Sequence, residues 1–147
     1  GGDLGDEIKD MNSILGWTIP LLDKNKPRHL LGIGYLRDME NVVSHGIDLF
    51  DCVVPTLYAR RNVAFIHGRR ELSSQKINLR NRQFIEAQSP LDKKCGCFVC
   101  QNYKRTYLSH LVRSNELSAF SLLTFHNLYF FNEFVAEIRK KIKQGKL

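Results

Sequence analysis

Three cysteines within six residues constrain this chain more than any other feature. Cys95, Cys97 and Cys100 stand close together, and His126 follows 26 residues after the last of them. Three neighbouring thiols cannot easily all be core residues or all pair as disulfides, but they can converge on one metal ion. Cys₃His is a standard ligand set of structural Zn²⁺, and it fills all four tetrahedral positions. The spacing therefore predicts one structural, non-catalytic zinc site.

His110 is an alternative fourth ligand for this site. It lies closer to the cysteines in sequence but inside a regular helical pattern, so we favour His126. Three cysteines without a metal are the other alternative, but closely spaced free thiols are a liability on a protein surface. The fourth cysteine, Cys52, stands alone in an apolar run. This usage is typical of metal binding in a reducing compartment, so we expect a cytoplasmic protein.

The composition favours a packed basic domain. The net charge is +7, which suits an anionic partner, nucleic acid first and a membrane surface second. A soluble basic protein without such a partner is the alternative. No apolar run approaches the roughly 18 residues of a membrane span, and the N-terminal residues do not resemble a signal peptide. We therefore exclude membrane-spanning and secreted disulfide-rich classes.

The first third of the chain has the pattern of a strand, a helix and a second strand. A helical face runs over residues 8–22 and ends near Pro20, and short apolar runs at 29–34 and 47–54 flank a helical pattern at 35–45. Buried parallel strands give such near-continuous apolar runs. The pattern predicts an α/β fold, either a barrel or an open parallel sheet, that needs more strands than these residues contain.

The remaining residues predict a hairpin followed by helices. Candidate hairpin strands lie at 63–66 and 76–79, one helix is expected from 101 to about 115, and a last helix over 118–143. Around the hairpin, arginines and a lysine alternate with aromatic residues. These residues are Tyr58, Arg60, Arg61, Phe65, Arg69, Arg70, Lys76, Arg80 and Arg82. Arginine binds phosphate and aromatic rings stack on unpaired bases, so this is a candidate RNA surface, with a solvated basic hairpin as the alternative.

Asp51 is the candidate catalytic carboxylate. It stands at the end of the second apolar run, and in α/β barrels the carboxyl ends of the strands form the active site. A buried carboxylate without an ion-pair partner is costly, which favours a functional role. The alternative is a structural aspartate bonded to loop amides. Asp48, its local rival, is expected to point to the opposite face and to lie deeper.

Several runs together resemble the family of queuine tRNA-ribosyltransferase, the tRNA-guanine transglycosylase. The resemblance is carried by residues 26–34 (KPRHLLGIG), 46–56 (GIDLFDCVVPT), 77–81 (INLRN) and 89–92 (SPLD), by the cysteine cluster, and by 124–127 (TFHN). It covers nearly the whole chain and fits the C-terminal third of a bacterial-type enzyme.

The resemblance implies the C-terminal part of a TIM barrel with an inserted zinc-binding subdomain. Residues 1–60 would be the last βα units, 61–130 the hairpin and zinc subdomain, and 131–147 the C-terminal helix. The implied enzyme is a pentosyltransferase in which Asp51 attacks the ribose and guanine is exchanged for a 7-deazaguanine precursor of queuosine. The implied partners are a tRNA with a GUN-type anticodon and a second copy of the complete enzyme. The family's general acid/base Asp is not in this chain, so we expect these residues alone to be inactive.

The resemblance also implies binding residues. Gly2 and Leu31 would contact the base. Two segments would contact the anticodon loop: Gly32, Ile33, Gly34, Tyr35, Leu36, Arg37 and Asp38, and then Thr56, Leu57, Tyr58, Ala59 and Arg60. The family usually has Arg where Leu57 stands. This departure mildly favours an alternative function, a non-catalytic tRNA-binding or partner subunit of the same fold.

Overall fold

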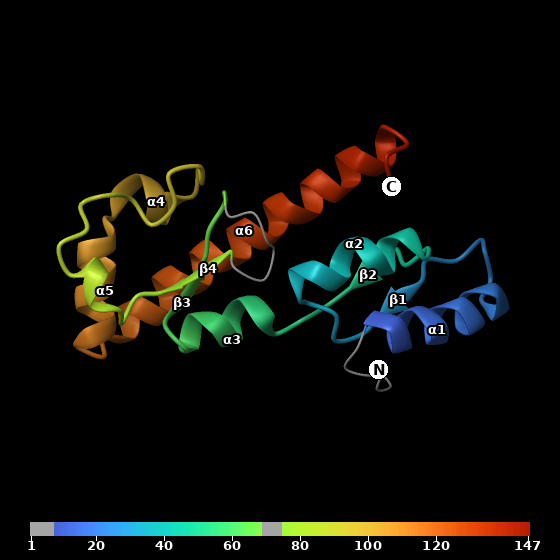
Figure 1. The fold of residues 1–147 in the computed structure, drawn as a ribbon, viewed down its shortest axis with the longest axis horizontal. Helices are drawn as coiled ribbons and strands as arrows, with labels where there is room; N and C mark the ends of the chain where they lie inside the picture. The colour runs from blue at the N-terminus through green and yellow to red at the C-terminus, as the bar shows by residue number, and fades with distance from the viewer. Residues whose placement is uncertain (1–7, 69–74) are drawn as a thin grey trace. The chain divides into compact units, whose positions relative to one another are not determined.

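A computed structural model describes residues 8–68 and 75–147, in which helices and short strands are mixed along the chain (Figure 1). The expected α/β class is confirmed at this level. The chain forms two compact units, one containing the residues up to Val54 with Lys141–Leu147, the other Pro55–Lys140. The four strands of the described residues pair two by two, so the complete barrel stays a prediction.

The first unit contains the predicted strand, helix and strand. Its elements are α1 (Ile8–Thr18), η1 (Ile19–Leu21), β1 (His29–Leu30), α2 (Leu36–Ser44) and β2 (Leu49–Phe50). β1 and β2 pair in parallel, with His29 opposite Leu49. Met11 and Leu15, one helical turn apart on α1, pack with Val42 of α2 in a small core.

Gly46 ends α2 as expected. Its φ of +92° lies in the left-handed region, which glycine adopts without the steric cost of a Cβ atom. The prediction that these short strands are buried, in contrast, is wrong. Each strand has two residues, and Leu49 is 50% exposed. Strands of a parallel sheet are buried when both faces of the sheet are covered and their edges are paired, and among the described residues β2 pairs only with β1.

The second unit contains the hairpin and most of the helices. Its elements begin with α3 (Val54–Arg60), whose first residue belongs to the first unit, and continue with β3 (Val63–Phe65), β4 (Lys76–Asn78), η3 (Arg82–Phe84), α4 (Phe98–Asn102), α5 (Arg105–Arg113) and α6 (Leu117–Lys143). The predicted hairpin is confirmed: β3 and β4 are antiparallel, with Ala64 opposite Ile77.

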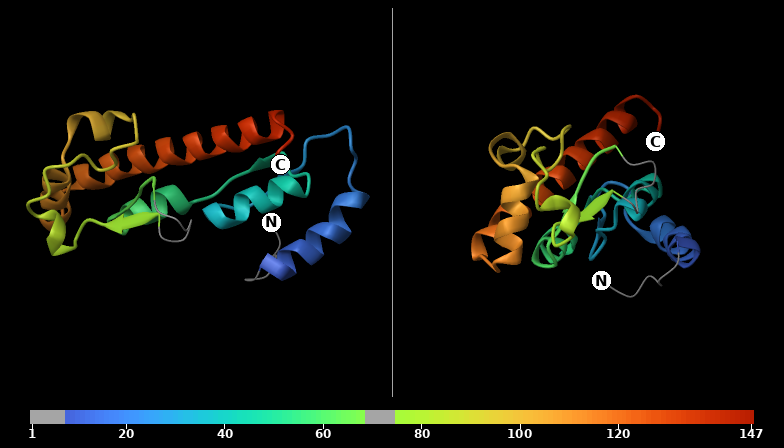
Figure 2. Two further views of the ribbon diagram at one scale, coloured as in Figure 1. Left: turned by 45° about the horizontal axis from the view of Figure 1, so that its top comes forward. Right: turned by 60° about the vertical axis from the view of Figure 1, so that its left-hand side comes forward.

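The hairpin lies beside the first half of α6, and α4 and α5 gather near the beginning of the same helix (Figures 1 and 2). Buried residues from all these elements form one core, which includes Ala64, Ile77, Val99, Leu108 and Leu123. The C-terminal helix predicted over 118–143 is confirmed. Among the described residues, none of the helices combines the length and the apolarity that crossing a bilayer requires.

The helix predicted from 101 to about 115 is confirmed over Arg105–Arg113 as α5, but its predicted beginning is wrong, because residues 101 and 102 belong to α4. Tyr103 and Lys104 are extended between the two helices. Lys104 forms an isolated β-bridge with Pro90, and the Arg105 N–H donates to the Ser89 carbonyl at 2.9 Å. These bonds to a distant loop replace helical ones, and apolar spacing within 101–115 cannot report them.

Candidate metal centre and catalytic carboxylate

The predicted metal ligands come together in the second unit. Nδ1 of His126 lies 3.8 Å from Sγ of Cys95 and 3.4 Å from the sulfurs of both Cys97 and Cys100. All four donor atoms lie within 4.8 Å of one another, so the cluster could hold a metal ion. All four cysteines of the chain are free thiols, and Cys52 lies outside this cluster. His110, the alternative ligand, is exposed on α5.

Local structure positions each donor. Cys97 precedes the first residue of α4, and its sulfur accepts the Cys100 N–H at 3.4 Å as a helix cap. His126 lies inside α6 and is fully buried. Its Nε2–H donates to the Phe65 carbonyl of β3 at 2.7 Å, which directs Nδ1 at the three sulfurs. Metal-bound histidines typically make such a bond with the nitrogen that does not bind the metal.

The pKa values of Cys95 and Cys100 in this cluster are shifted in opposite directions. The hydrogen bond with Cys100 lowers the pKa of Cys95 to about 4, and the same bond raises the pKa of the Cys100 thiol. Burial lowers the pKa of His126, but hydrogen bonds that the protonated ring donates to the sulfurs of Cys95 and Cys97 outweigh it and raise that pKa to about 9. Cys95 therefore favours the thiolate form, in which cysteine binds a metal ion.

Asp51 directly follows β2 in the first unit, at the carboxyl end of that strand. Its side chain is 63% exposed, so the prediction of a buried carboxylate is wrong. One oxygen, Oδ1, lies 3.2 Å from Nε2 of His29 on β1. Asp48 is also exposed, contrary to the expectation that it lies deeper, and its Oδ2 accepts the Arg28 N–H. Among the described residues, the side-chain contact of Asp51 is with His29 and uses Oδ1.

The predicted base contacts can be placed only in part. Leu31, two residues after His29, is 48% exposed, whereas Gly2 lies outside the described residues. Gly34 is packed on Cys52: a Cβ atom there would lie 2.2 Å from the Cys52 sulfur. Only glycine fits at this position, which keeps the segment after β1 against the segment that carries Asp51.

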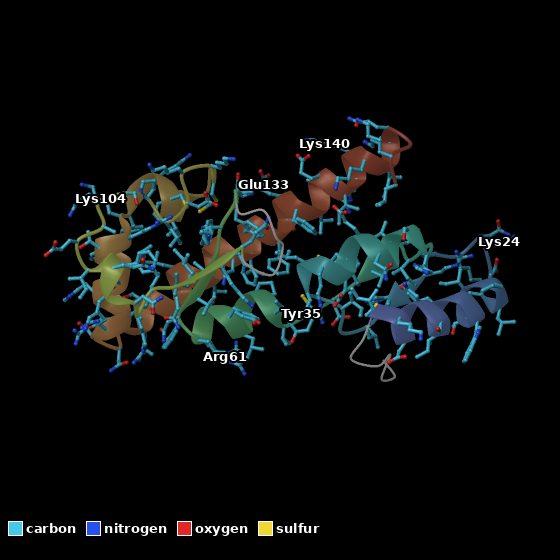
Figure 3. All side chains as sticks on the ribbon, viewed as in Figure 1. Lys24, Tyr35, Arg61, Lys104, Glu133 and Lys140 are labelled. Carbon is cyan, nitrogen blue, oxygen red and sulfur yellow. The ribbon has the colours of Figure 1, made fainter. Side chains whose placement is uncertain are left out.

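The first predicted RNA segment is divided between exposed and buried side chains. Tyr35, labelled in Figure 3, lies at the start of α2 and is exposed, and the Arg37 guanidinium lies 5.7 Å from its ring centre. Ile33, Leu36 and Asp38 are buried, and Gly32 has a φ of +77°. Burial raises the pKa of Asp38, although Arg37 partly offsets this effect.

The second predicted RNA segment lies on α3. Ala59 is fully buried, Arg60 is exposed, and Thr56, Leu57 and Tyr58 are partly buried. Nζ of Lys76, from β4, lies 4.8 Å from the centre of the Tyr58 ring. Arg61 directly follows the helix (Figure 3). A cationic and aromatic surface is therefore present on α3 and β4.

Two buried polar residues were not predicted to have a role. Asn127 is fully buried and bonds to Pro55, Val63 and Phe65. Asp92 is also buried and accepts the backbone N–H groups of His67 and Lys94. Burial raises the pKa of Asp92, but these hydrogen bonds outweigh it and lower the pKa. The burial of Asn127 could have been predicted from the sequence, because it lies four residues after Leu123 and three before Phe130, on the apolar face of a helix.

Known proteins resemble this chain over nearly its whole length. A family model described as Queuine tRNA-ribosyltransferase matches residues 1–147. A protein of Archaeoglobus fulgidus is 44% identical over 148 residues, which cover 99% of this chain and 37% of its own length. A protein of a Cyanothece species named queuine tRNA-ribosyltransferase is 43% identical over 97% of this chain and 36% of its own length. A protein of Halothermothrix orenii with the same name is 40% identical over 100% of this chain and 38% of its own length. The chain thus spans little more than a third of each relative, and it belongs to the queuine tRNA-ribosyltransferase family.

Proposed function

We propose that these residues are part of a tRNA-guanine transglycosylase that exchanges guanine at the anticodon wobble position for a 7-deazaguanine precursor of queuosine. The observation that carries the proposal is the family match over the whole chain, with Asp51 exposed at the carboxyl end of a parallel strand. The substrates would be a tRNA with a GUN-type anticodon and the deazaguanine base.

The proposed reaction has two displacements at C1′ of the target ribose. Asp51 Oδ2 attacks C1′, and the bond from C1′ to guanine breaks with its electron pair, so that guanine leaves after taking a proton from a general acid outside this chain. The deazaguanine then gives a proton to the same group, which now acts as a base, and attacks C1′; the bond from C1′ to Asp51 breaks with its electron pair and releases the carboxylate. Two such steps replace one difficult displacement, the usual advantage of a covalent intermediate.

We assign Zn²⁺ to the metal cluster, with Cys95, Cys97, Cys100 and His126 as ligands. Zinc bonds of about 2.3 Å to sulfur and about 2.0 Å to nitrogen, at tetrahedral angles, separate sulfur from nitrogen by about 3.5 Å. The observed separations of 3.4–3.8 Å fit this value. With four protein ligands the ion has no open position, so its role would be structural.

The resemblance also supports the proposed architecture and partners. The first unit would supply the last strands of a TIM barrel, and the second would be the inserted zinc-binding subdomain. Exposed groups of the two RNA segments, Tyr35, Arg37 and Arg60 among them, would contact the anticodon loop, and Leu31 would stack on the base. The complete enzyme would be a homodimer, and these 147 residues alone would be inactive because the general acid/base lies outside them.

Incorporation of labelled guanine into tRNA by the full-length protein tests the proposal. Exchange that requires the anticodon guanine would support it. Binding of tRNA without any exchange would instead favour the alternative of a non-catalytic subunit, for which Leu57 in place of Arg is the sequence evidence.

His29→Phe should slow formation of the covalent tRNA adduct about tenfold, because Asp51 loses the N–H donor that holds Oδ1. His29→Gln, which keeps a donor at similar reach, should restore most of the rate. Single-turnover adduct formation at saturating tRNA measures the effect. Equal rates in His29→Phe and the wild type would show that the pair has no role in orienting Asp51.

A further inference from the structure

The side chain of Asn127 satisfies three backbone groups that are distant in sequence. Its Oδ1 accepts the Phe65 N–H at 3.0 Å, and its Nδ2 donates to the carbonyls of Val63 and Pro55, each at 3.0 Å. Asn127 is fully buried, so water does not replace these bonds. Both amide hydrogens are therefore used, and the side chain connects α6 to β3 and to the first turn of α3.

These bonds provide partners for the backbone groups on the edge of β3 that faces away from β4. Asn62 and Ile66 bond toward β4, through the Asn62 carbonyl to Leu79 and the Ile66 N–H to Gln75. The alternate residues Val63 and Phe65 direct their backbone groups to the opposite side, where a third strand would normally pair. Instead of a strand, side chains of α6 bond to them.

Asn127 and the metal ligand His126 act on the same strand. They are consecutive on α6, and while Asn127 bonds to the Phe65 N–H, His126 bonds to the Phe65 carbonyl. Since His126 belongs to the metal cluster, the residue before Asn127 is held in place there. The bond from Asn127 Nδ2 to the Pro55 carbonyl then ties Pro55 to the same part of α6. The first turn of α3 is thus held by the helix that carries the metal ligand.

We propose that Asn127 is a positioning residue for tRNA recognition. By holding Pro55, it sets the position of α3, whose residues Thr56–Arg60 would contact the anticodon loop; this inference rests on the proposed function. Without the amide, the Val63 carbonyl and the Phe65 N–H lose their partner on α6, and the Pro55 carbonyl loses its bond to that helix, so the first turn of α3 is expected to shift. The chemistry at Asp51 does not use Asn127.

The test is Asn127→Ser in the full-length protein, with Asn132→Ser as the matched control. Asn132 lies on the same helix, is exposed, and bonds only to the Leu128 carbonyl of its own helix among the described interactions. Asn127→Ser should raise KM for tRNA about tenfold, leave kcat within about twofold and retain one zinc per chain. The amides of α3 should exchange hydrogen faster, while those of the cysteine segment should not change. The control should match the wild type.

An unchanged KM for tRNA in folded Asn127→Ser would overturn the proposal. Loss of zinc together with faster hydrogen exchange in the cysteine segment would also overturn it, because that result indicates a merely structural role. If the wild type itself does not exchange guanine, the proposed function fails instead. If the variant does not fold, the proposal is tested by hydrogen exchange of the wild-type protein with and without tRNA. Binding of tRNA should then slow exchange at the Phe65 amide as well as in α3, and protection of α3 alone would overturn the coupling.

Discussion

An Asp51→Asn variant of the full-length protein should form no covalent adduct with tRNA, and labelled-guanine exchange should fall about 10⁴-fold or more, as is common when a nucleophile is removed. The amide has nearly the same size and its oxygen can still accept a hydrogen bond from His29, which lies 3.2 Å from Asp51 Oδ1. The fold should therefore persist. What is lost is the negative charge that attacks C1′. A tRNA adduct trapped with a base analogue and resolved under denaturing conditions measures the effect.

Asp48→Asn is the matched control for this prediction. Asp48 lies three residues before Asp51, is also exposed, and accepts the Arg28 N–H through Oδ2, a bond that an amide oxygen can replace. This variant should exchange guanine at nearly the wild-type rate. Adduct formation by Asp51→Asn at the normal rate would refute the assignment of the nucleophile, and loss of the adduct only in Asp48→Asn would transfer the role to Asp48.

The metal cluster could be predicted from the sequence because its information is largely local. Cys95, Cys97 and Cys100 lie within six residues, in the loop before α4 and in its first turn, and the ligand chemistry requires a fourth donor. The hairpin and α6 were also predictable, since their apolar patterns arise within each element. The break between α4 and α5 was not, because it depends on the bond from Arg105 to Ser89, which periodicity does not contain.

The environment of the candidate site was harder to predict. The apolar run before Asp51 indicated a buried strand, yet the Asp51 side chain is 63% exposed, because burial depends on neighbouring strands that the described residues do not supply. Asn127 could be predicted to face the core of the second unit. Its partners could not be predicted, because Pro55, Val63 and Phe65 lie 62–72 residues away in sequence. Position on a face is local information, whereas the choice of a partner is not.

Cys97→Ala should remove the metal and destabilise the second unit more than any surface change. Cys97 is 1% exposed and serves both as a metal ligand and as the cap of α4. Structural zinc supplies a large share of folding free energy in small domains. We therefore expect a loss of about 4 kcal/mol or more, equivalent to a fall in melting temperature of roughly 10 °C. Metal analysis and thermal unfolding of the full-length protein measure both effects.

Cys52→Ser is the control for this prediction, because Cys52 is a partly buried free thiol outside the metal cluster. It should keep one zinc per chain and nearly the wild-type melting temperature. Removal of zinc by a chelator should reproduce the effect of Cys97→Ala, and exchange should fail only as the second unit unfolds, because a fully coordinated ion has no position for substrate. A chelated protein that keeps its melting temperature but loses exchange would instead place the metal in the reaction.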